Sequence, residues 1–375
     1  MITFLLTYVP NPRMNKRIGL AKKNDSVSVI CVSRKGQNLW EPFHQDVPHN
    51  ILELEMPSIR HPARRLFAFL HFFRYAVRQL KQSSPDIIFC AGIDCLLIAV
   101  LFSLRKRISI IYEVSDIREC YLANRTDIIT RFFPAFEKLL LKKVSLLVIT
   151  SEMFFDAYYR NLIDREKVLY IPNSPDLRFF HGYEKRPHEK FTIGFIGGIR
   201  YLNQLKMLLD AGAQLDDVRI FIAGGSGESD MEARLKDYAQ GKKNITFLGR
   251  YDYAAQIRGL YEMADCIYSV YDADNPNVRI ALPNKLYEAV YCELPIIVAA
   301  GTNLANIVNK YGVGISVPHN DVGKLTDEIR RLAKKDSFYL SIVKNCHDRK
   351  QEILFSDALN RLENRLRSER RSDRP

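Results

Sequence analysis

The residues whose types and spacing best suit chemistry are Lys285 and Glu288, in the run Pro283-Asn-Lys-Leu-Tyr-Glu288. Proline is tolerated in the first turn of a helix, so this run predicts a helix that begins near residues 283–285, with Asn284 as its cap. Positions i and i+3 lie on one helix face, which places Lys285 and Glu288 together. A lysine at a helix N-terminus suits a phosphate, and the carboxylate can accept hydrogen bonds from a sugar diol. The alternative is a surface ion pair, which contributes little.

Two glycine turns follow apolar runs short enough to be strands buried in a parallel sheet. The strand predicted over 191–196 leads into Gly197 and Gly198, and the strand over 219–223 leads into Gly224 and Gly225. Ligands collect at the carboxyl ends of such strands, and glycine lets backbone N–H groups approach them closely. Residues 2–17 open a β-α-β unit without G-x-G-x-x-G, which argues against a dinucleotide-dependent dehydrogenase.

Three carboxylates stand near the carboxyl ends of strands predicted in the first half of the chain. Asp94 follows the strand over 85–90, and Glu113 and Asp116 lie at the end of the strand over 108–114. They are candidate ligand contacts, with helix capping and loop hydrogen bonds as the alternative for each one.

Several stretches resemble the retaining nucleotide-sugar glycosyltransferases of the GT-B architecture, family four, which include bacterial enzymes of surface polysaccharide synthesis. One shared feature is Pro-Asn-Lys-x-x-Glu-Ala before the strand Pro295-Ile-Ile297, and another is the linker Pro172-Asn-Ser-Pro-Asp-Leu-Arg-Phe179, with Ser174 in place of glycine. The resemblance implies that Glu288 holds the ribose of the donor nucleotide and that the first glycine turn meets the donor diphosphate. It implies a nucleotide diphosphate sugar as co-substrate.

The resemblance also implies an arginine and a lysine that stabilise the leaving phosphate. The family's arginine stands directly after the first glycine, where this chain has Gly198, so Arg200 and Lys206 are the expected substitutes, with a solvent-facing helix position as the alternative for Lys206. The family's second glutamate is replaced by Ile280, which makes the loop over 271–279 the candidate for sugar selection.

On the acceptor side, the resemblance assigns Tyr112-Glu-Val-Ser-Asp116 to a run that carries a histidine in the family, here replaced by Ser115. Asp94, Glu113 and Asp116 remain the acceptor-side candidates. We expect no catalytic metal, because the glycine turns carry no Asp-x-Asp; Asp272-Ala-Asp274 is a weak exception.

The composition is that of a globular protein: 375 residues, 47% hydrophobic and 26% charged, with a net charge of +12. The seven cysteines show neither C-x-x-C pairs nor zinc spacing, which predicts buried thiols in the cytoplasm. Residues 60–78 interleave arginines with phenylalanines, which predicts either a helix on an anionic membrane surface or an ordinary amphipathic helix. No nucleic-acid-binding motif is present.

The order of elements predicts an α/β protein of two doubly wound Rossmann-like domains facing a cleft, the GT-B architecture. The expected divisions are residues 1–172 for the acceptor-side domain, 173–190 for the linker, 191–345 for the donor domain, and 346–375 for a helix that returns to the first domain and a disordered end. The expected function is transfer of a sugar to a polysaccharide or lipid-linked glycan. A nucleotide-sugar 2-epimerase and an inactive membrane scaffold are the alternatives.

Overall fold

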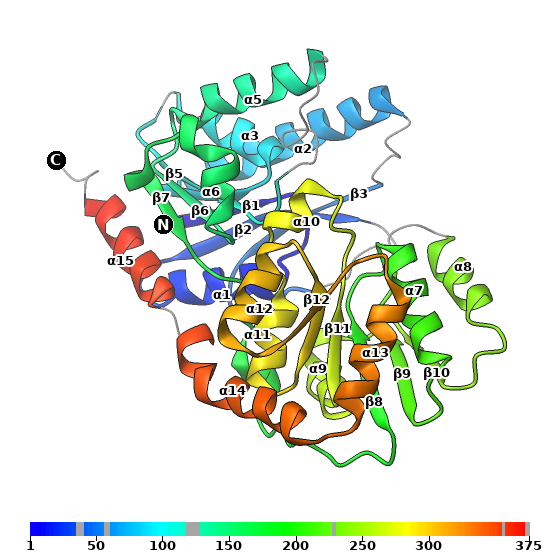
Figure 1. Ribbon diagram of the computed structural model, residues 1–375. Helices are drawn as coiled ribbons and strands as arrows, with labels where there is room; N and C mark the ends of the chain where they lie inside the picture. The colour runs from blue at the N-terminus through cyan, green and yellow to red at the C-terminus, as the bar shows by residue number, and fades with distance from the viewer. Residues whose placement is uncertain are drawn as a thin grey trace. The chain divides into compact units, whose positions relative to one another are not determined.

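The computed structural model describes residues 1–34, 41–55, 61–104, 106–117, 128–226, 230–354 and 357–371. The chain divides into two compact units. Unit 1 is Met1–Pro172 with Asp357–Pro375, and unit 2 is Asn173–Ser356. Each unit is built on its own parallel sheet (Figure 1).

Unit 1 contains a seven-stranded sheet in the order β3-β2-β1-β4-β5-β6-β7, with every neighbouring pair parallel. Its inner strands are buried along their whole length, because helices cover both faces of the sheet. The strands are β1 (Ile2–Leu6), β2 (Val27–Arg34), β3 (His49–Leu54), β4 (Ile87–Ala91), β5 (Ser109–Val114), β6 (Leu146–Ile149) and β7 (Val168–Tyr170).

The helices of unit 1 form two layers. Figure 1 shows α2, α3 and α5 on one face of the sheet and α1 and α15 on the other. In the second layer, Phe4 of β1 belongs to the same core as Ile18 of α1 and Leu362 of α15. The helices are α1 (Pro12–Ala21), α2 (Pro62–Ser83), α3 (Ile93–Ser103), α5 (Ile128–Leu141), α6 (Met153–Ala157) and α15 (Ala358–Arg371).

Unit 2 contains a six-stranded parallel sheet in the order β10-β9-β8-β11-β12-β13. The chain order reverses direction between β8 and β11, so the loops after these two strands diverge at a switch point, where open α/β sheets bind ligands. The strands are β8 (Phe191–Ile196), β9 (Val218–Ala223), β10 (Ile245–Gly249), β11 (Cys266–Ser269), β12 (Ile296–Ala299) and β13 (Gly314–Val317).

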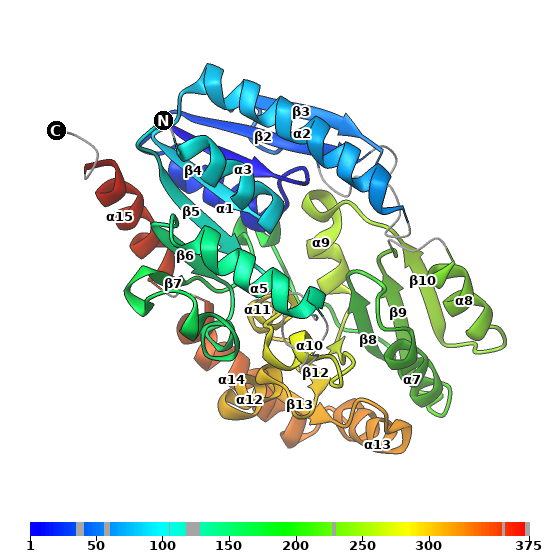
Figure 2. The same ribbon diagram turned by 90° about the horizontal axis from the view of Figure 1, so that it is seen from above.

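The helices of unit 2 also cover both faces of its sheet. Helices α7 and α13 pack against each other on one face, and α9 and α11 lie on the other, as Figure 2 shows from above. The helices are α7 (Leu202–Gly212), α8 (Met231–Tyr238), α9 (Tyr253–Glu262), α10 (Pro276–Ile280), α11 (Asn284–Tyr291), α12 (Asn303–Tyr311), α13 (Val322–Ala333) and α14 (Ser337–Leu354).

The prediction of two doubly wound α/β domains is confirmed by these two sheets and their helix layers. The returning helix differs in its start: residues 346–354 finish α14 within unit 2, and α15, which packs on unit 1, begins at Ala358. In the described residues, no helix is both long enough and apolar enough to cross a bilayer.

Candidate functional site

The carboxyl ends of β8 and β9 are two glycine turns in close contact. Gly197 and Gly224 have φ angles of +142° and +141°, which side chains of L-residues rarely allow. A Cβ on Gly224 would lie 1.9 Å from the carbonyl oxygen of Gly197. Their own N–H groups donate to the carbonyls of Ala223 and Gly249. Gly197 and Gly224 therefore shape the turns, and a ligand would meet the rest of the turn.

Lys285 extends from α11 to the first of these turns. Its Cε and Nζ would lie 3.1 and 3.3 Å from a Cβ on Gly197. The side chain is 6% exposed; Nζ lies 3.8 Å from the centre of the Phe195 ring and donates a hydrogen bond of 2.9 Å to the Tyr271 hydroxyl. Lys285 thus places a buried positive charge beside the glycine turn.

The N-terminus of α11 has no side-chain cap. The N-cap position is Pro283, and Asn284 is the first helical residue, so the prediction that Asn284 caps the helix is wrong. Proline has no hydroxyl or carboxylate with which to satisfy the first N–H groups of the helix. This end of α11 therefore keeps both its partial positive charge and backbone donors for an anion.

Glu288 lies one turn further along α11 and is 3% exposed. Its Oε1 accepts a hydrogen bond of 2.6 Å from the Tyr253 hydroxyl, and Oε2 accepts one of 2.7 Å from the Tyr261 hydroxyl. Burial raises the pKa of Glu288, while both hydroxyls and the charge of Lys285 lower it. Burial, and then the charge of Glu288, raise the pKa of both tyrosines. The surface ion-pair alternative is therefore wrong, because both members of the pair are buried.

Arg200 and Lys206 lie in different surroundings. The exposed Arg200 bends back over the first turn, with Nε 3.5 Å from the position of a Cβ on Gly198. Lys206 lies on α7, with Nζ 4.4 Å from the centre of the Tyr238 ring on α8. Gly225 is half-buried beside Arg250, whose Nε would lie 2.6 Å from a Cβ on this glycine. Arg200 thus lies at the turn where the sequence placed it, whereas Lys206 contacts the neighbouring helix.

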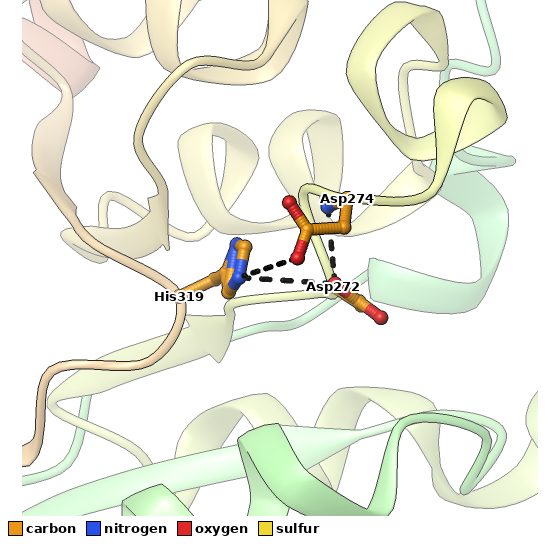
Figure 3. Close-up of side chains that lie close together, drawn as sticks. All are labelled: Asp272, Asp274 and His319. Atoms are coloured by element: carbon orange, nitrogen blue, oxygen red, sulfur yellow. Dashed lines mark hydrogen bonds and ion pairs between the residues drawn. The ribbon is translucent and has the colours of Figure 1, made fainter.

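The loop between β11 and α10 contacts His319, which follows β13. Figure 3 shows Asp272 and Asp274 around this ring, with their carboxylate oxygens 3.8 and 3.6 Å from Nε2. These three side chains are close enough to share a cation. However, Nδ1 accepts a hydrogen bond of 3.1 Å from the Ala273 N–H, so the neutral ring carries its proton on Nε2. The ring therefore presents an N–H to the carboxylates and not the lone pair that a metal needs.

In unit 1, the three acceptor-side candidates differ in access. Glu113 is 2% exposed and forms ion pairs with Arg13 (Nε to Oε1, 2.8 Å) and Arg17 (Nε to Oε2, 3.1 Å) of α1. Its carboxylate thereby joins α1 to β5 and is occupied at both oxygens. Asp94, in the first turn of α3, and Asp116, after β5, are exposed.

Four aromatic residues around the site were not predicted from the sequence. Tyr253 and Tyr261 bind Glu288, and Tyr271 and Phe195 surround Lys285. Tyr261 shares a face of α9 with the buried Ile257 and Leu260, so its role looked purely structural. Tyr271 lies in the loop over 271–279 that the sequence suggested for sugar selection. That placement was the one sequence feature that pointed to any of these four residues.

Comparison with known families identifies both halves of the chain. The family model described as "Glycosyl transferase 4-like domain" matches residues 19–174, and the one described as "Glycosyl transferases group 1" matches residues 190–335. The succinoglycan biosynthesis protein ExoL of Rhizobium meliloti is 24% identical over 339 residues, which cover 86% of this chain and 82% of ExoL.

Solved structures share the fold over nearly the whole chain. Sucrose-phosphate synthase from Thermosynechococcus elongatus matches with a TM-score of 0.73 at 16% identity, covering 98% of each chain. HepE from Anabaena, in complex with UDP-glucose, matches with a TM-score of 0.73 at 16% identity, covering 98% of this chain and 99% of HepE. With two glycosyltransferase family models spanning most of its length, the chain belongs to the glycosyltransferases of the GT-B fold.

Proposed function

We propose that this glycosyltransferase moves a sugar, with retention, from a nucleotide diphosphate sugar to a polysaccharide or lipid-linked glycan. The observation that carries the proposal is the position of Lys285. Its buried ammonium lies beside a glycine turn, and among the described residues no carboxylate forms an ion pair with it. A buried charge is costly unless it is paired, so the site favours an anionic ligand. The diphosphate of the donor is such an anion.

The site offers contacts for both the diphosphate and the ribose of a donor. In the transfer, the bond between the anomeric carbon and the phosphate oxygen breaks and its electron pair stays on the phosphate, while the acceptor oxygen bonds to the carbon and gives its proton to the departing phosphate. Lys285, Arg200 and the uncapped end of α11 would stabilise the charge that develops on the phosphate. Glu288 would accept the ribose hydroxyls, since a carboxylate offers about four acceptor positions and the tyrosines occupy two. No metal or other cofactor is needed for these roles.

The named relatives support the two substrate classes. HepE was solved with UDP-glucose, and ExoL is named for the biosynthesis of succinoglycan. These names favour a nucleotide sugar as donor and a glycan as acceptor. An inactive scaffold would bind no nucleotide, and a 2-epimerase would convert the donor without any acceptor.

The first test is thermal unfolding of the wild type and of Glu288→Ala with UDP, GDP, ADP and NAD. A ligand that binds only the native state raises the unfolding temperature. We expect one nucleoside diphosphate to stabilise the wild type but not Glu288→Ala. The exposed Glu352 on α14 supplies a matched control, and Glu352→Ala should respond as the wild type does. No response of the folded wild type to any of these ligands would refute the donor site.

Product analysis then separates transfer from epimerisation. The nucleotide sugar with the base found in the first test is incubated with the protein, with and without a glycan acceptor. Transfer requires the acceptor and releases the nucleoside diphosphate. A rearranged nucleotide sugar formed without acceptor would establish the 2-epimerase instead.

We also propose that α2 holds the protein at the cytoplasmic face of an anionic membrane. Its first half exposes Leu66 (58%) and Phe67 (72%) next to the exposed Arg64 and Arg65, a combination of apolar and basic side chains that suits anionic lipids. Further along, Phe72 is buried in the core, so only part of the predicted aromatic face is available. Residue 60 of the predicted stretch lies outside the described residues.

Vesicle sedimentation tests this surface. We expect the wild type to sediment with vesicles that contain anionic lipids, and a variant in which Arg64, Arg65, Arg74 and Arg78 are replaced by Gln to remain in the supernatant. The control replaces four exposed arginines of unit 2, which are Arg234, Arg330, Arg331 and Arg349. Equal sedimentation of the α2 variant and this control would contradict a specific role for α2.

A further inference from the structure

Lys285 has hydrogen-bonding capacity that the described residues leave unused. An ammonium group has three N–H donors, and the one acceptor that the described residues offer it is the Tyr271 hydroxyl. Its other close neighbours are the faces of Phe195 and Tyr271, with ring centres 3.8 and 5.0 Å from Nζ. Aromatic faces attract a cation without neutralising it. The surroundings of Lys285 therefore hold the charge in place and leave it available.

The Tyr271 hydroxyl also has hydrogen-bonding capacity that the described residues leave unused. It accepts a hydrogen bond from Lys285, so its own O–H remains to donate, and in the described residues it has no acceptor. A hydroxyl that accepts from a cation becomes a stronger donor, because hydrogen bonds in a chain polarise one another. Nζ and the Tyr271 oxygen are 2.9 Å apart, so one ligand oxygen, or two on the same phosphate, can accept from both.

The Tyr271 backbone is fixed by contacts that do not involve its hydroxyl. In the loop that follows, the Ala273 N–H donates to His319 (3.1 Å), and the Ala273 carbonyl accepts from Arg279 Nε (2.6 Å), so the loop is held on both sides. The Tyr271 ring also lies against Tyr201, with ring centres 5.4 Å apart. Preorganisation of this kind means that little has to be ordered when a ligand arrives.

We propose that Tyr271 is a second donor to the phosphate that Lys285 binds, so that the two side chains together hold the diphosphate of the nucleotide sugar. This inference rests on the proposed function and assigns a ligand contact to a residue that the sequence pattern did not mark. Tyr271 then recognises the phosphate part of the ligand and not the nucleoside. That division can be measured without knowing the acceptor.

The test compares a nucleoside with its diphosphate by calorimetric titration, using uridine with UDP, guanosine with GDP and adenosine with ADP. The dissociation constant of the nucleoside divided by that of its diphosphate measures what the diphosphate adds to binding. Tyr271→Phe keeps the ring that contacts Lys285 and removes only the hydroxyl. Because a hydrogen bond to a charged group is worth about a factor of ten or more, we expect this ratio to fall at least about tenfold, with nucleoside affinity unchanged.

Two further variants separate ligand binding from folding. Lys285→Met removes a buried charge that forms no ion pair among the described residues, although it lowers the pKa of Glu288. We expect the variant to fold, which its thermal unfolding checks, while it loses most of the diphosphate contribution. Tyr311→Phe is the matched control, because Tyr311 also accepts a hydrogen bond from a lysine, Lys310, but on α12. Its ratio should equal that of the wild type.

The outcomes distinguish the inference from the function on which it rests. If Lys285→Met loses the diphosphate contribution and Tyr271→Phe keeps it, the inference is overturned and the donor site stands. A fall in nucleoside affinity equal to the fall in diphosphate affinity would show that Tyr271 only supports the fold of the loop. Failure of every nucleoside diphosphate to bind the folded wild type would overturn both.

Discussion

Removal of the Tyr261 hydroxyl tests the internal structure of the site most directly. Tyr261 is completely buried, and its hydroxyl donates a hydrogen bond of 2.7 Å to the carboxylate of Glu288. Tyr261→Phe leaves that oxygen without its partner in a place water does not reach. A hydrogen bond to a charged group contributes about 1.5–3 kcal/mol, so we expect unit 2 to lose about 2 kcal/mol of stability. For a unit of this size that corresponds to a fall of about 4–8 °C in unfolding temperature.

The pH dependence of this loss has a definite sign. Burial raises the pKa of Glu288 and the two hydroxyls lower it, so removing one of them raises the pKa of Glu288 further. A carboxyl whose pKa is raised in the folded state favours folding at low pH, and this advantage disappears as the pH rises through the folded pKa. The deficit of Tyr261→Phe relative to the wild type should therefore be larger at neutral pH than at acidic pH, because protonation of Glu288 removes the charge that the hydroxyls stabilise.

Thermal unfolding followed by circular dichroism at the two pH values measures both effects. Tyr268→Phe is the matched control, because Tyr268 is also completely buried in unit 2 and donates a hydrogen bond of 2.7 Å, but to the neutral backbone carbonyl of Gln204. Its loss should be about 1 kcal/mol and should not depend on Glu288. Equal deficits of Tyr261→Phe at both pH values, or a deficit no larger than that of the control, would refute the reasoning.

Three other changes test the glycine turns, unit 1 and the role of metals. Gly224→Ala should destabilise unit 2 by about 3 kcal/mol or more and abolish nucleotide binding, because its Cβ would lie 1.9 Å from a backbone oxygen. The control is Gly259→Ala inside α9, where a Cβ meets no neighbouring atom, and it should be neutral or stabilising in the same unfolding assay. Glu113→Ala should cost about 3–5 kcal/mol, since it leaves two arginines without their carboxylate, whereas the exposed Asp94→Ala should change little in a urea titration. Nucleotide binding and sugar transfer should survive EDTA, because the His319 ring faces its carboxylates with an N–H; activity that is lost in EDTA and restored by a divalent cation would contradict this.

The secondary structure could be predicted wherever hydrophobic patterning was strong. The continuous apolar runs at β4, β5 and β8 became buried strands, because strands covered on both faces by helices need no polar alternation. The short β13 has little hydrophobic pattern of its own, since Gly312 and Gly314 dominate the local sequence. Gly312 does end α12 with a φ of +61°, but pairing with β12 makes Gly314 the first residue of a strand. β3, an edge strand with alternating exposure, also lacked a clear local signal.

The sequence alone determined which elements present the site and which side chains share a helix face. Proline at the start of α11, glycines after β8 and β9, and the three-residue spacing of Lys285 and Glu288 all act through local backbone geometry. The partners of these two residues were decided only by the tertiary structure. Glu288 is held by tyrosines of α9 and Lys285 by Tyr271 and Phe195, because the parallel sheet brings the ends of strands distant in sequence to one edge. Local pattern reveals a charge, but packing determines whether that charge is neutralised or left for a ligand.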